Sequence, residues 1–209
     1  MLELRNFRKS YHGHLALRVE HLRLPPGIHW IRGVNGSGKT TLFRSIAGML
    51  PCEGEIWLDG KAEVSKNPVE YRLRVNYGEA EPAYPEFLSA RELIRFVAKA
   101  KQAPPAQAAE LAETLGVTVF WGNPFGTYSS GMRKKTALVL ALLGQPRLVM
   151  LDEPLNALDL AATQRLSDLV RERHAAGVSF LLSSHQEFNA EGWPIDGRYV
   201  VDDQTVRPA

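Results

Sequence analysis

A glycine-rich segment, Gly33-Val34-Asn35-Gly36-Ser37-Gly38-Lys39-Thr40, has the residue types and spacing of a loop that holds polyphosphate. Glycines allow the backbone to wrap around a highly charged ligand, so that successive N–H groups point inward. A helix that begins near Lys39 would add its positive N-terminal end. The residues that we expect to contact a bound nucleotide here are Gly33, Asn35, Gly36, Ser37, Gly38, Lys39, Thr40 and Thr41.

The last two residues of the pattern have separate roles. We expect the ammonium of Lys39 to reach the β- and γ-phosphates of ATP, and the hydroxyl of Thr40 to ligate Mg²⁺. An apolar segment, Ile28 to Ile31, precedes the loop and reads as a strand. Strand, loop and helix in this order are the context that the pattern requires, which argues against an accidental glycine-rich turn.

Two carboxylates, Asp152 and Glu153, directly follow the apolar run Leu148 to Leu151. Such a run is typical of a parallel strand that is covered on both faces, and ligands of open α/β sheets bind at the carboxyl ends of strands. We expect Asp152 to hold Mg²⁺, directly or through water, and Glu153 to orient or deprotonate an attacking water. Without the phosphate loop, the pair would read equally well as a strand-end acidic turn.

A second buried strand, predicted from Ser179 to Leu182, is followed by Ser183, Ser184 and His185. A single histidine is more often a surface or core residue than a functional one. His185 differs by its position at the end of a neighbouring strand, where it could contact the γ-phosphate or the attacking water. The candidate catalytic residues are therefore Lys39, Glu153 and His185.

The elements that position these groups follow from the hydrophobic pattern. Further strands are predicted at Leu2 to Phe7, Leu15 to Val19, Glu55 to Leu58 and Arg198 to Val201. Helices are predicted from Lys39 to about Gly48, from the capping residue Ser89 to Ala100, and over residues 107–115, 131–143 and 160–176. Alternating strands and helices with a helical insert imply an α/β core plus a helical subdomain.

Composition is that of an ordinary folded domain. The chain has 209 residues, of which 44% are hydrophobic and 23% charged, so a packed core is expected. The formal net charge of +2 gives no electrostatic footprint for nucleic acid, and no nucleic-acid partner is expected. Cys52 is the one cysteine, which suits a reducing compartment and reads as a small packed or surface residue.

No membrane span or secretory signal is expected. The longest apolar run, Ala137 to Leu143, is too short to cross a bilayer. The segment after Met1 alternates apolar and polar residues, as a strand does. We therefore expect a soluble chain that acts at a membrane only through a partner chain.

The chain resembles the ATP-binding subunit of ABC transporters. The distinguishing segment is Tyr128-Ser129-Ser130-Gly131-Met132-Arg133-Lys134-Lys135, which looks like the signature motif of that family. The resemblance extends from Leu2 to about Asp203. It implies a single α/β domain over residues 1–209. Residues 1–77 and 145–209 would form a phosphate-loop NTPase core with a parallel-rich sheet and an N-terminal antiparallel β-subdomain, and residues 78–144 a helical subdomain that carries the signature.

The resemblance also assigns roles to individual residues. Ser129 and Gly131 would contact the γ-phosphate held by a second copy of the domain, so that ATP is sandwiched between two chains. Tyr11 would stack on adenine. The loop Asn156-Ala157-Leu158-Asp159 would cross the dimer seam, and His185 would be the switch histidine.

The chain departs from the family pattern at several positions. Ser130 replaces a glycine, Met132 a glutamine and Asn156 a serine. The metal-contacting glutamine that is expected after Tyr77 is missing. Glu79 is the nearest candidate to replace it as a metal ligand, with Glu81 as the alternative.

The resemblance implies an ATPase that drives transport as a homodimer or as a heterodimer with a paralogue. The cofactor would be Mg²⁺, and an integral membrane permease subunit on another chain would hold the protein, cytoplasmic and peripheral, at the inner face of the cell membrane. The groove for that partner could be formed by Tyr84, Pro85, Phe87 and residues 121–125, which otherwise belong to ordinary core.

Two other functions are considered beside transport. One is a soluble ABC-type ATPase in cofactor assembly, translation or DNA repair, and the other is a regulatory module without turnover. The intact candidate catalytic residues argue against the latter.

Overall fold

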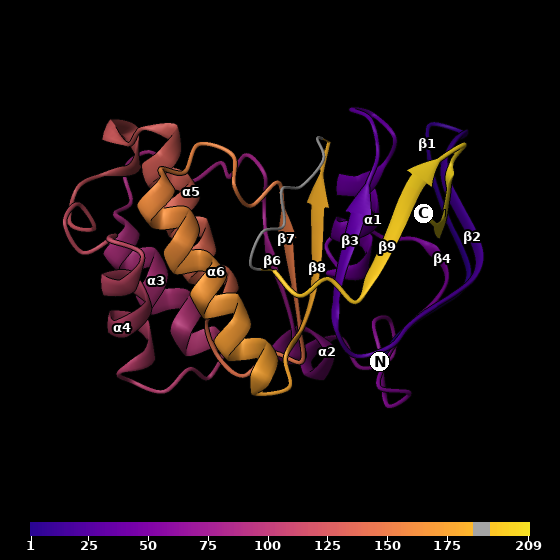
Figure 1. Ribbon diagram of the computed structural model, residues 1–209, viewed down its shortest axis with the longest axis horizontal. Helices are drawn as coiled ribbons and strands as arrows, with labels where there is room; N and C mark the ends of the chain where they lie inside the picture. Colours follow the sequence, from indigo (N-terminus) through magenta and orange to yellow (C-terminus); the bar gives the residue numbers. More distant parts are fainter. Residues whose placement is uncertain (186–192) are drawn as a thin grey trace.

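The computed structural model describes residues 1–185 and 193–209, which form two sheets and a group of helices (Figure 1). The larger sheet has six strands in the order β10-β9-β3-β8-β7-β6. Its strands are β3 (Ile28–Arg32), β6 (Val75–Gly78), β7 (Leu148–Asp152), β8 (Ser179–Ser184), β9 (Gly197–Asp202) and β10 (Thr205–Pro208). All its pairings are parallel except that of β9 with β10.

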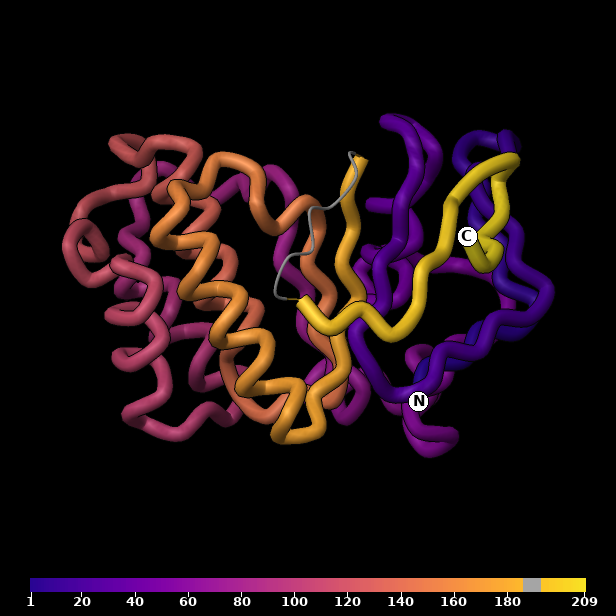
Figure 2. The backbone as a smooth tube through the Cα atoms, viewed as in Figure 1, coloured from indigo at the N-terminus to yellow at the C-terminus, as the bar shows by residue number. Residues whose placement is uncertain are grey.

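The smaller sheet is antiparallel and has four strands in the order β2-β1-β4-β5. They are β1 (Leu2–Tyr11), β2 (His14–Leu24), β4 (Glu53–Leu58) and β5 (Ala62–Glu63). The helices are α1 (Lys39–Ile46), α2 (Pro68–Arg74), α3 (Ala90–Ala100), α4 (Gln107–Thr114), α5 (Ser130–Ala141) and α6 (Leu160–Ala175), with a 3₁₀ turn at Phe125–Thr127. Both ends of the chain lie in the part of the molecule that contains the smaller sheet (Figure 2).

Two hydrophobic clusters cover the two faces of the larger sheet. Leu148 and Met150 of β7 belong to the cluster that includes the smaller sheet and α1. Val149 and Leu151 belong to the cluster that includes α3, α4, α5 and α6. Successive residues of a strand point to opposite faces, so an uninterrupted apolar run is what a strand buried on both sides requires.

The predicted fold class is confirmed: a parallel-rich α/β core is accompanied by an N-terminal antiparallel sheet and a group of helices. Each predicted strand and helix is present, although β1 and β2 extend further than their predicted ranges. The sequence did not predict α2, β5, β6 and β10, which are short or lack a strong hydrophobic period. The proposed boundaries at residues 77 and 145 stay a prediction. Within the described residues, none of the helices has both the length and the apolar character needed to cross a membrane.

Candidate nucleotide site

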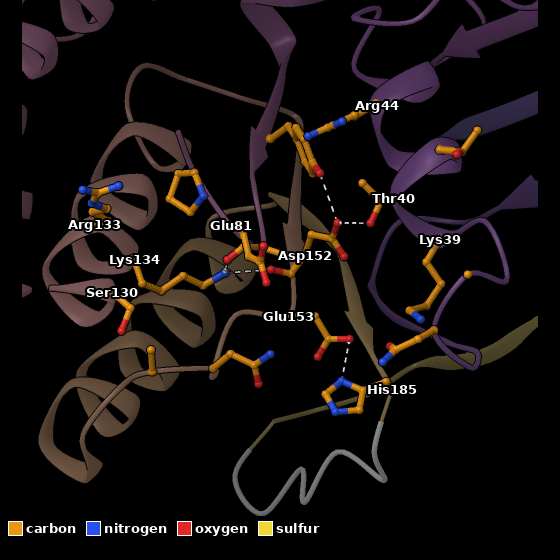
Figure 3. A pocket seen from close by; sticks show the side chains of 18 of the residues that line it. Lys39, Thr40, Arg44, Glu81, Ser130, Arg133, Lys134, Asp152, Glu153 and His185 are labelled. Atoms are coloured by element: carbon orange, nitrogen blue, oxygen red, sulfur yellow. Dashed lines mark hydrogen bonds and ion pairs between the residues drawn. The ribbon is translucent and has the colours of Figure 1, made fainter. Parts of the chain in front are cut away.

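A cavity of about 870 Å³ lies at the carboxyl ends of the parallel strands. The phosphate loop and α1 line one side, and the start of α5 lines the opposite side (Figure 3). Asp152, Glu153 and His185 lie between them. The topology therefore brings together the phosphate loop, the acidic pair and the histidine that the sequence predicted.

The phosphate loop depends on backbone conformations that favour glycine. Gly36 and Gly38 have φ angles of 82° and 106°, in the left-handed region. Gly38 is also the N-cap of α1, whose first turn contains no acidic residue. The positive end of the helix is therefore uncompensated by its own side chains and faces the loop, as an anion site requires.

The ammonium of Lys39 lies inside this loop. It donates hydrogen bonds to the carbonyl oxygens of Gly33, at 2.6 Å, and Val34, at 3.1 Å. The residue is 7% exposed, so its charge is held close to the loop rather than extended into solvent. Phosphate oxygens that enter the loop can accept hydrogen bonds from the same ammonium group in place of the two carbonyls.

Asp152 is the centre of a network of hydroxyl groups. Its Oδ2 accepts hydrogen bonds from Thr40 at 2.7 Å and from Tyr77 at 3.1 Å, and its Oδ1 accepts one from Ser183. Asp152 is 1% exposed, so the network fixes its carboxylate in place. Two of the residues expected to hold Mg²⁺, Thr40 and Asp152, therefore lie in contact. Their oxygen atoms are the type of ligand that this hard cation prefers.

Glu153 points into the cavity toward His185. Its Oε1 lies 3.0 Å from Nδ1 of His185, and its side chain is 13% exposed. The backbone of Glu153 has a φ angle of 46°, which is unusual for a residue with a side chain. Its N–H donates to Oγ of Ser183 at 3.1 Å. A carboxylate with access to the cavity and a fixed backbone is suited to orient and deprotonate a water.

The two candidates for the missing glutamine have different surroundings. The carboxylate of Glu79 pairs with Arg44 at 3.3 Å. Glu81 lines the cavity and is drawn beside the end of β7 in Figure 3. Among the described residues, no cation pairs with Glu81, so its carboxylate lines the nucleotide site unpaired whereas that of Glu79 is held by Arg44.

The signature segment forms the start of α5. Ser129 is its N-cap, and the Ser129 hydroxyl accepts a hydrogen bond from the N–H of Met132 at 3.2 Å. Gly131 packs so closely on the loop after β7 that an added Cβ would lie 2.8 Å from the carbonyl oxygen of Ala157. Lys135 forms an ion pair with Asp159 at 2.7 Å. The signature and the predicted seam loop are thus in direct contact within one chain.

Lys134, between these two contacts, is buried, with 2% of its surface exposed. Its ammonium donates to the carbonyl oxygens of Asp152 at 2.8 Å, Glu79 at 3.0 Å and Ala80 at 3.3 Å. Burial lowers the pKa of Lys134 to about 8, although the charges of Asp152 and Glu153 act in the opposite direction. Lys134 therefore connects α5 to the acidic pair and to the loop that contains Glu79 and Glu81.

Tyr11, predicted to stack on adenine, lies at the end of β1 beside the phosphate loop. Its ring is 41% exposed, its hydroxyl lies 3.4 Å from Oγ1 of Thr41, and the ammonium of Lys9 lies 4.8 Å from the ring centroid. An exposed ring at the edge of the loop is available to a planar base. Adenine stacking stays a prediction.

The aromatic residues considered for a partner groove separate into two environments. Phe125 is fully buried, and its ring centroid is 4.6 Å from that of Tyr84. Phe87 is 81% exposed. Core packing therefore accounts for Phe125 and Tyr84, whereas Phe87 presents an apolar ring to the surface.

Sequence reasoning missed the roles of Tyr77, Ser183 and Lys134. Ser183 stands in the polar end of a predicted strand, so its place beside Asp152 could have been inferred. Tyr77 lies on β6, which the sequence did not predict. Lys134 stands in a run of three basic residues, and the sequence has no feature that separates the one buried member from its neighbours.

Comparison with known proteins is consistent with this geometry. A family model described as ABC transporter matches residues 20–156. The phospholipid-transporting ATPase ABCA7 of Homo sapiens is 37% identical over 193 residues, which cover 88% of this chain and 9% of that protein. The cytochrome c biogenesis ATP-binding export protein CcmA 2 of Cupriavidus metallidurans is 35% identical over 190 residues, which cover 88% of this chain and 89% of that protein.

Solved structures agree with the sequence comparisons. The structure of an ATP-binding subunit of an ABC transporter is similar to this one with a TM-score of 0.88 and 26% sequence identity. The similarity covers 99% of this chain and 88% of that chain.

Proposed function

The chain belongs to the ABC transporter family, and we propose that it is the ATP-hydrolysing motor of a membrane transporter, working as a dimer that sandwiches ATP. The observation that carries the proposal is the convergence of Lys39, Thr40, Asp152, Glu153 and His185 on one cavity at the carboxyl ends of the parallel strands. The reaction is the hydrolysis of ATP to ADP and phosphate.

The substrate binds with its phosphates in the loop from Gly33 to Thr40. Lys39 exchanges its hydrogen bonds with the carbonyl groups of Gly33 and Val34 for bonds with the β- and γ-phosphates. Thr40 and Asp152 would hold Mg²⁺, assisted by Glu81 or Glu79. Bound Mg²⁺ supplies positive charge that offsets the charge of the phosphates.

Glu153 and His185 act on the attacking water. The Glu153 carboxylate accepts a proton from the water as the water oxygen forms its bond to the γ-phosphorus and the bond to the ADP oxygen breaks. His185, which lies 3.0 Å from Glu153, holds that carboxylate in orientation and contacts the γ-phosphate. Tyr11 stacks on the adenine from the edge of the loop.

A second chain completes each site. The start of α5 lies across the cavity from the phosphate loop of the same chain, and Ser129 and Gly131 at this end of the helix would contact the nucleotide of another copy. A two-fold pair would close two shared sites, with Asn156 to Asp159 at the seam. ATP then joins the two chains, and hydrolysis separates them.

The proposed partner is an integral membrane permease, which would hold the chain at the inner face of the membrane. The chain spans only 9% of the human relative and 89% of the bacterial one, which is named as an ATP-binding export protein. Both relatives have names that describe transport or export, which supports transport over a soluble ABC-type ATPase.

The test has two stages. Purified chain is assayed for phosphate release from ATP with Mg²⁺, and the absence of release would overturn the ATPase assignment. The chain is then expressed with a multi-span membrane protein from a neighbouring reading frame. Detergent extracts are analysed for a stable complex whose ATPase rate differs from that of the isolated chain. A chain that hydrolyses ATP but forms no such complex would favour the soluble alternative.

A further inference from the structure

Lys134 is a buried cation for which the proposed reaction has no use. It lies in the second turn of α5 and is 2% exposed. Transfer of an ammonium group out of water is costly unless the group is satisfied by hydrogen bonds. Three carbonyl oxygens satisfy it, those of Glu79, Ala80 and Asp152. The position of this charge therefore depends on main-chain atoms of two other segments.

One of these carbonyls belongs to the peptide that joins Asp152 to Glu153. The ammonium of Lys134 donates to the carbonyl oxygen of this peptide at 2.8 Å, and the N–H of the peptide donates to Oγ of Ser183 at 3.1 Å. Both polar atoms of this peptide are therefore held by side chains, on opposite edges of the peptide plane. Because Glu153 has the unusual φ angle of 46°, its carboxylate would change direction if the peptide rotated.

The other two carbonyls belong to the loop after β6, which leads to Glu81. Lys134 therefore joins, at a single ammonium group, the peptide of the proposed catalytic base and the loop that carries the proposed substitute for the missing glutamine. Figure 3 shows the side chain of Lys134 extending from α5 to the end of β7.

The neighbours of Lys134 along α5 contact the same stretch of chain. Gly131 packs on the carbonyl of Ala157, and Lys135 pairs with Asp159 at 2.7 Å. The start of α5 is therefore attached to residues 152–159 at three points. A displacement of this end of the helix must move that segment with it, because packed interiors transmit strain.

We propose that Lys134 is a positioning residue that couples the signature end of α5 to the carboxylate of Glu153 in the same chain. When Ser129 and Gly131 contact the nucleotide of the partner chain, the shift of α5 reaches Glu153 through the ammonium of Lys134. Each of the two sites in the dimer thereby responds to occupancy of the other. This inference rests on the proposed function, since it assumes an ATP-sandwich dimer.

The experiment replaces Lys134 with methionine, which has a similar length and apolar stem but no charge and no donor. ATP turnover is measured over a range of ATP concentrations, and ATP binding is measured separately by calorimetry. We expect kcat to fall by about tenfold to a hundredfold, because the carboxylate loses its fixed orientation, while KM and binding affinity stay within about twofold. We also expect the Hill coefficient for ATP to fall toward one.

Lys101→Met is the matched control. Lys101 is a half-buried lysine whose ammonium also donates to main-chain carbonyls, those of Arg72 and Val75, and partial burial lowers its pKa to about 8 as well. It caps the other end of the sheet, away from the cavity. Its replacement should leave kcat and the Hill coefficient unchanged, and an equal loss in both variants would overturn the proposal.

Lys134→Gln is the second variant, since its amide retains a donor for the same carbonyls. We expect kcat between those of wild type and Lys134→Met. Folding of each variant is checked by thermal melting. Wild-type kcat in a folded Lys134→Met chain overturns the proposal, as does a failure of both Lys134 variants to fold. If wild type itself has no ATPase activity, the proposed function fails instead, so the two failures can be told apart.

Discussion

The carboxylate of Glu153 lies 3.0 Å from Nδ1 of His185, although 31 residues separate the two in the sequence. Their parallel strands β7 and β8 are paired in register, with Asp152 opposite Ser183. The residues that follow each strand therefore meet at the same edge of the sheet. The pairing of the two strands therefore places a carboxylate and an imidazole side by side at the cavity. The contact depends on the sheet and not on the residues next to either group in the sequence.

Glu153→Gln tests the role of the proposed base. Glutamine retains the size of the side chain but cannot accept a proton from water, so we expect kcat to fall by about a hundredfold or more, while ATP binding is retained. The variant should also form an ATP-dependent dimer that is visible by size-exclusion chromatography. Glu172→Gln, which changes an exposed glutamate of α6, is the control. Equal turnover by wild type and Glu153→Gln would remove Glu153 from the reaction.

Lys39→Met tests the phosphate loop. Hydrogen bonds to charged groups contribute about 1.5–3 kcal/mol, so loss of the ammonium should weaken ATP binding by roughly tenfold to a hundredfold. Calorimetry at constant ionic strength measures the effect directly. Lys61→Met changes an exposed lysine and should bind ATP as wild type does. An unchanged affinity in Lys39→Met would contradict the loop assignment.

Glu81→Gln and Glu79→Gln form a matched pair that decides which carboxylate assists the metal. Glu81 lines the cavity, so its replacement should raise the Mg²⁺ concentration needed for half-maximal turnover by several-fold. Glu79 pairs with Arg44, so Glu79→Gln should mainly affect stability. Magnesium titrations of ATPase activity distinguish the two, and the reverse order of effects would assign the role to Glu79.

Gly131→Ala tests the contact between the signature and the seam loop. The added Cβ would lie 2.8 Å from the carbonyl oxygen of Ala157, so one of the two segments must move. We expect ATP-dependent dimerisation of the Glu153→Gln chain to weaken by about tenfold or more when this second change is added. Gly122→Ala is the control, because no atom lies within 4 Å of its Cβ position. Dimerisation unaffected by Gly131→Ala would show that the close packing has no role in the seam.

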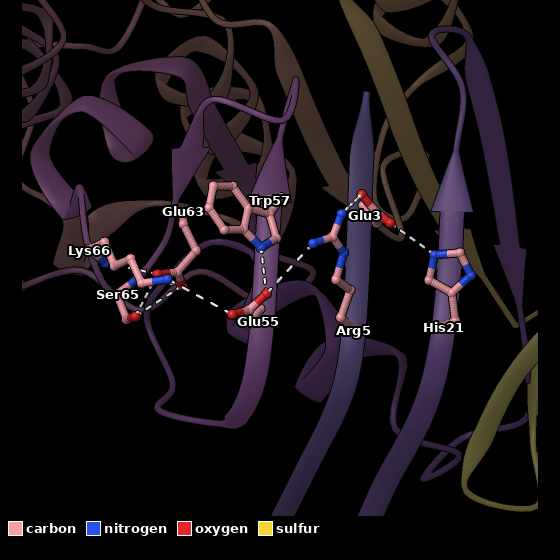
Figure 4. A network of polar contacts seen from close by, with 8 residues as sticks. All are labelled: Glu3, Arg5, His21, Glu55, Trp57, Glu63, Ser65 and Lys66. Carbon is pink, nitrogen blue, oxygen red and sulfur yellow. Dashed lines mark hydrogen bonds and ion pairs between the residues drawn. The ribbon is translucent and has the colours of Figure 1, made fainter.

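Glu3 on the outer face of the smaller sheet provides a test that is independent of the nucleotide site (Figure 4). Hydrogen bonds from Arg5 and then His21 lower its pKa from 4.5 to about 2. Because the pKa of the folded state is the lower one, the contribution of Glu3 to stability is fully present above pH 4.5 and is lost as pH falls toward 2. The difference in unfolding free energy between wild type and Glu3→Gln should therefore decrease over this range.

Denaturant titrations at several pH values measure that difference. High salt should reduce it at every pH, because the network is exposed to solvent. Glu113→Gln, on the surface of α4, controls for the simple loss of one negative charge. A difference that stays constant from pH 4.5 to 2 would contradict the lowered pKa of Glu3.

The sequence predicted most of the fold because the strands of the core are strongly patterned. Uninterrupted apolar runs marked β7 and β8, and the glycine spacing marked the phosphate loop between β3 and α1. The short strand β6 was missed, since its four residues include a buried asparagine that bonds to the carbonyls of Ala141 and Leu143. Tertiary contacts, rather than local pattern, specify that strand.

The candidate site was predicted where its residues follow strands or occupy a known spacing. Burial of Lys134 could not be predicted, because it depends on three carbonyls that are far from it in the sequence. The surroundings of Glu79 differ from those of Glu81 through its ion pair with Arg44, a residue far from Glu79 in the sequence. Side-chain partners across elements are settled by three-dimensional packing, which a single sequence does not record.

The strand that ends in the acidic pair contributes alternate residues to both hydrophobic clusters. If the residues of either cluster unfold, one face of this strand therefore becomes exposed to solvent. Destabilising substitutions in the antiparallel sheet or in the outer helices should lower the fraction of folded molecules. Variants far from the nucleotide can therefore reduce total ATPase activity without changing the residues of the site.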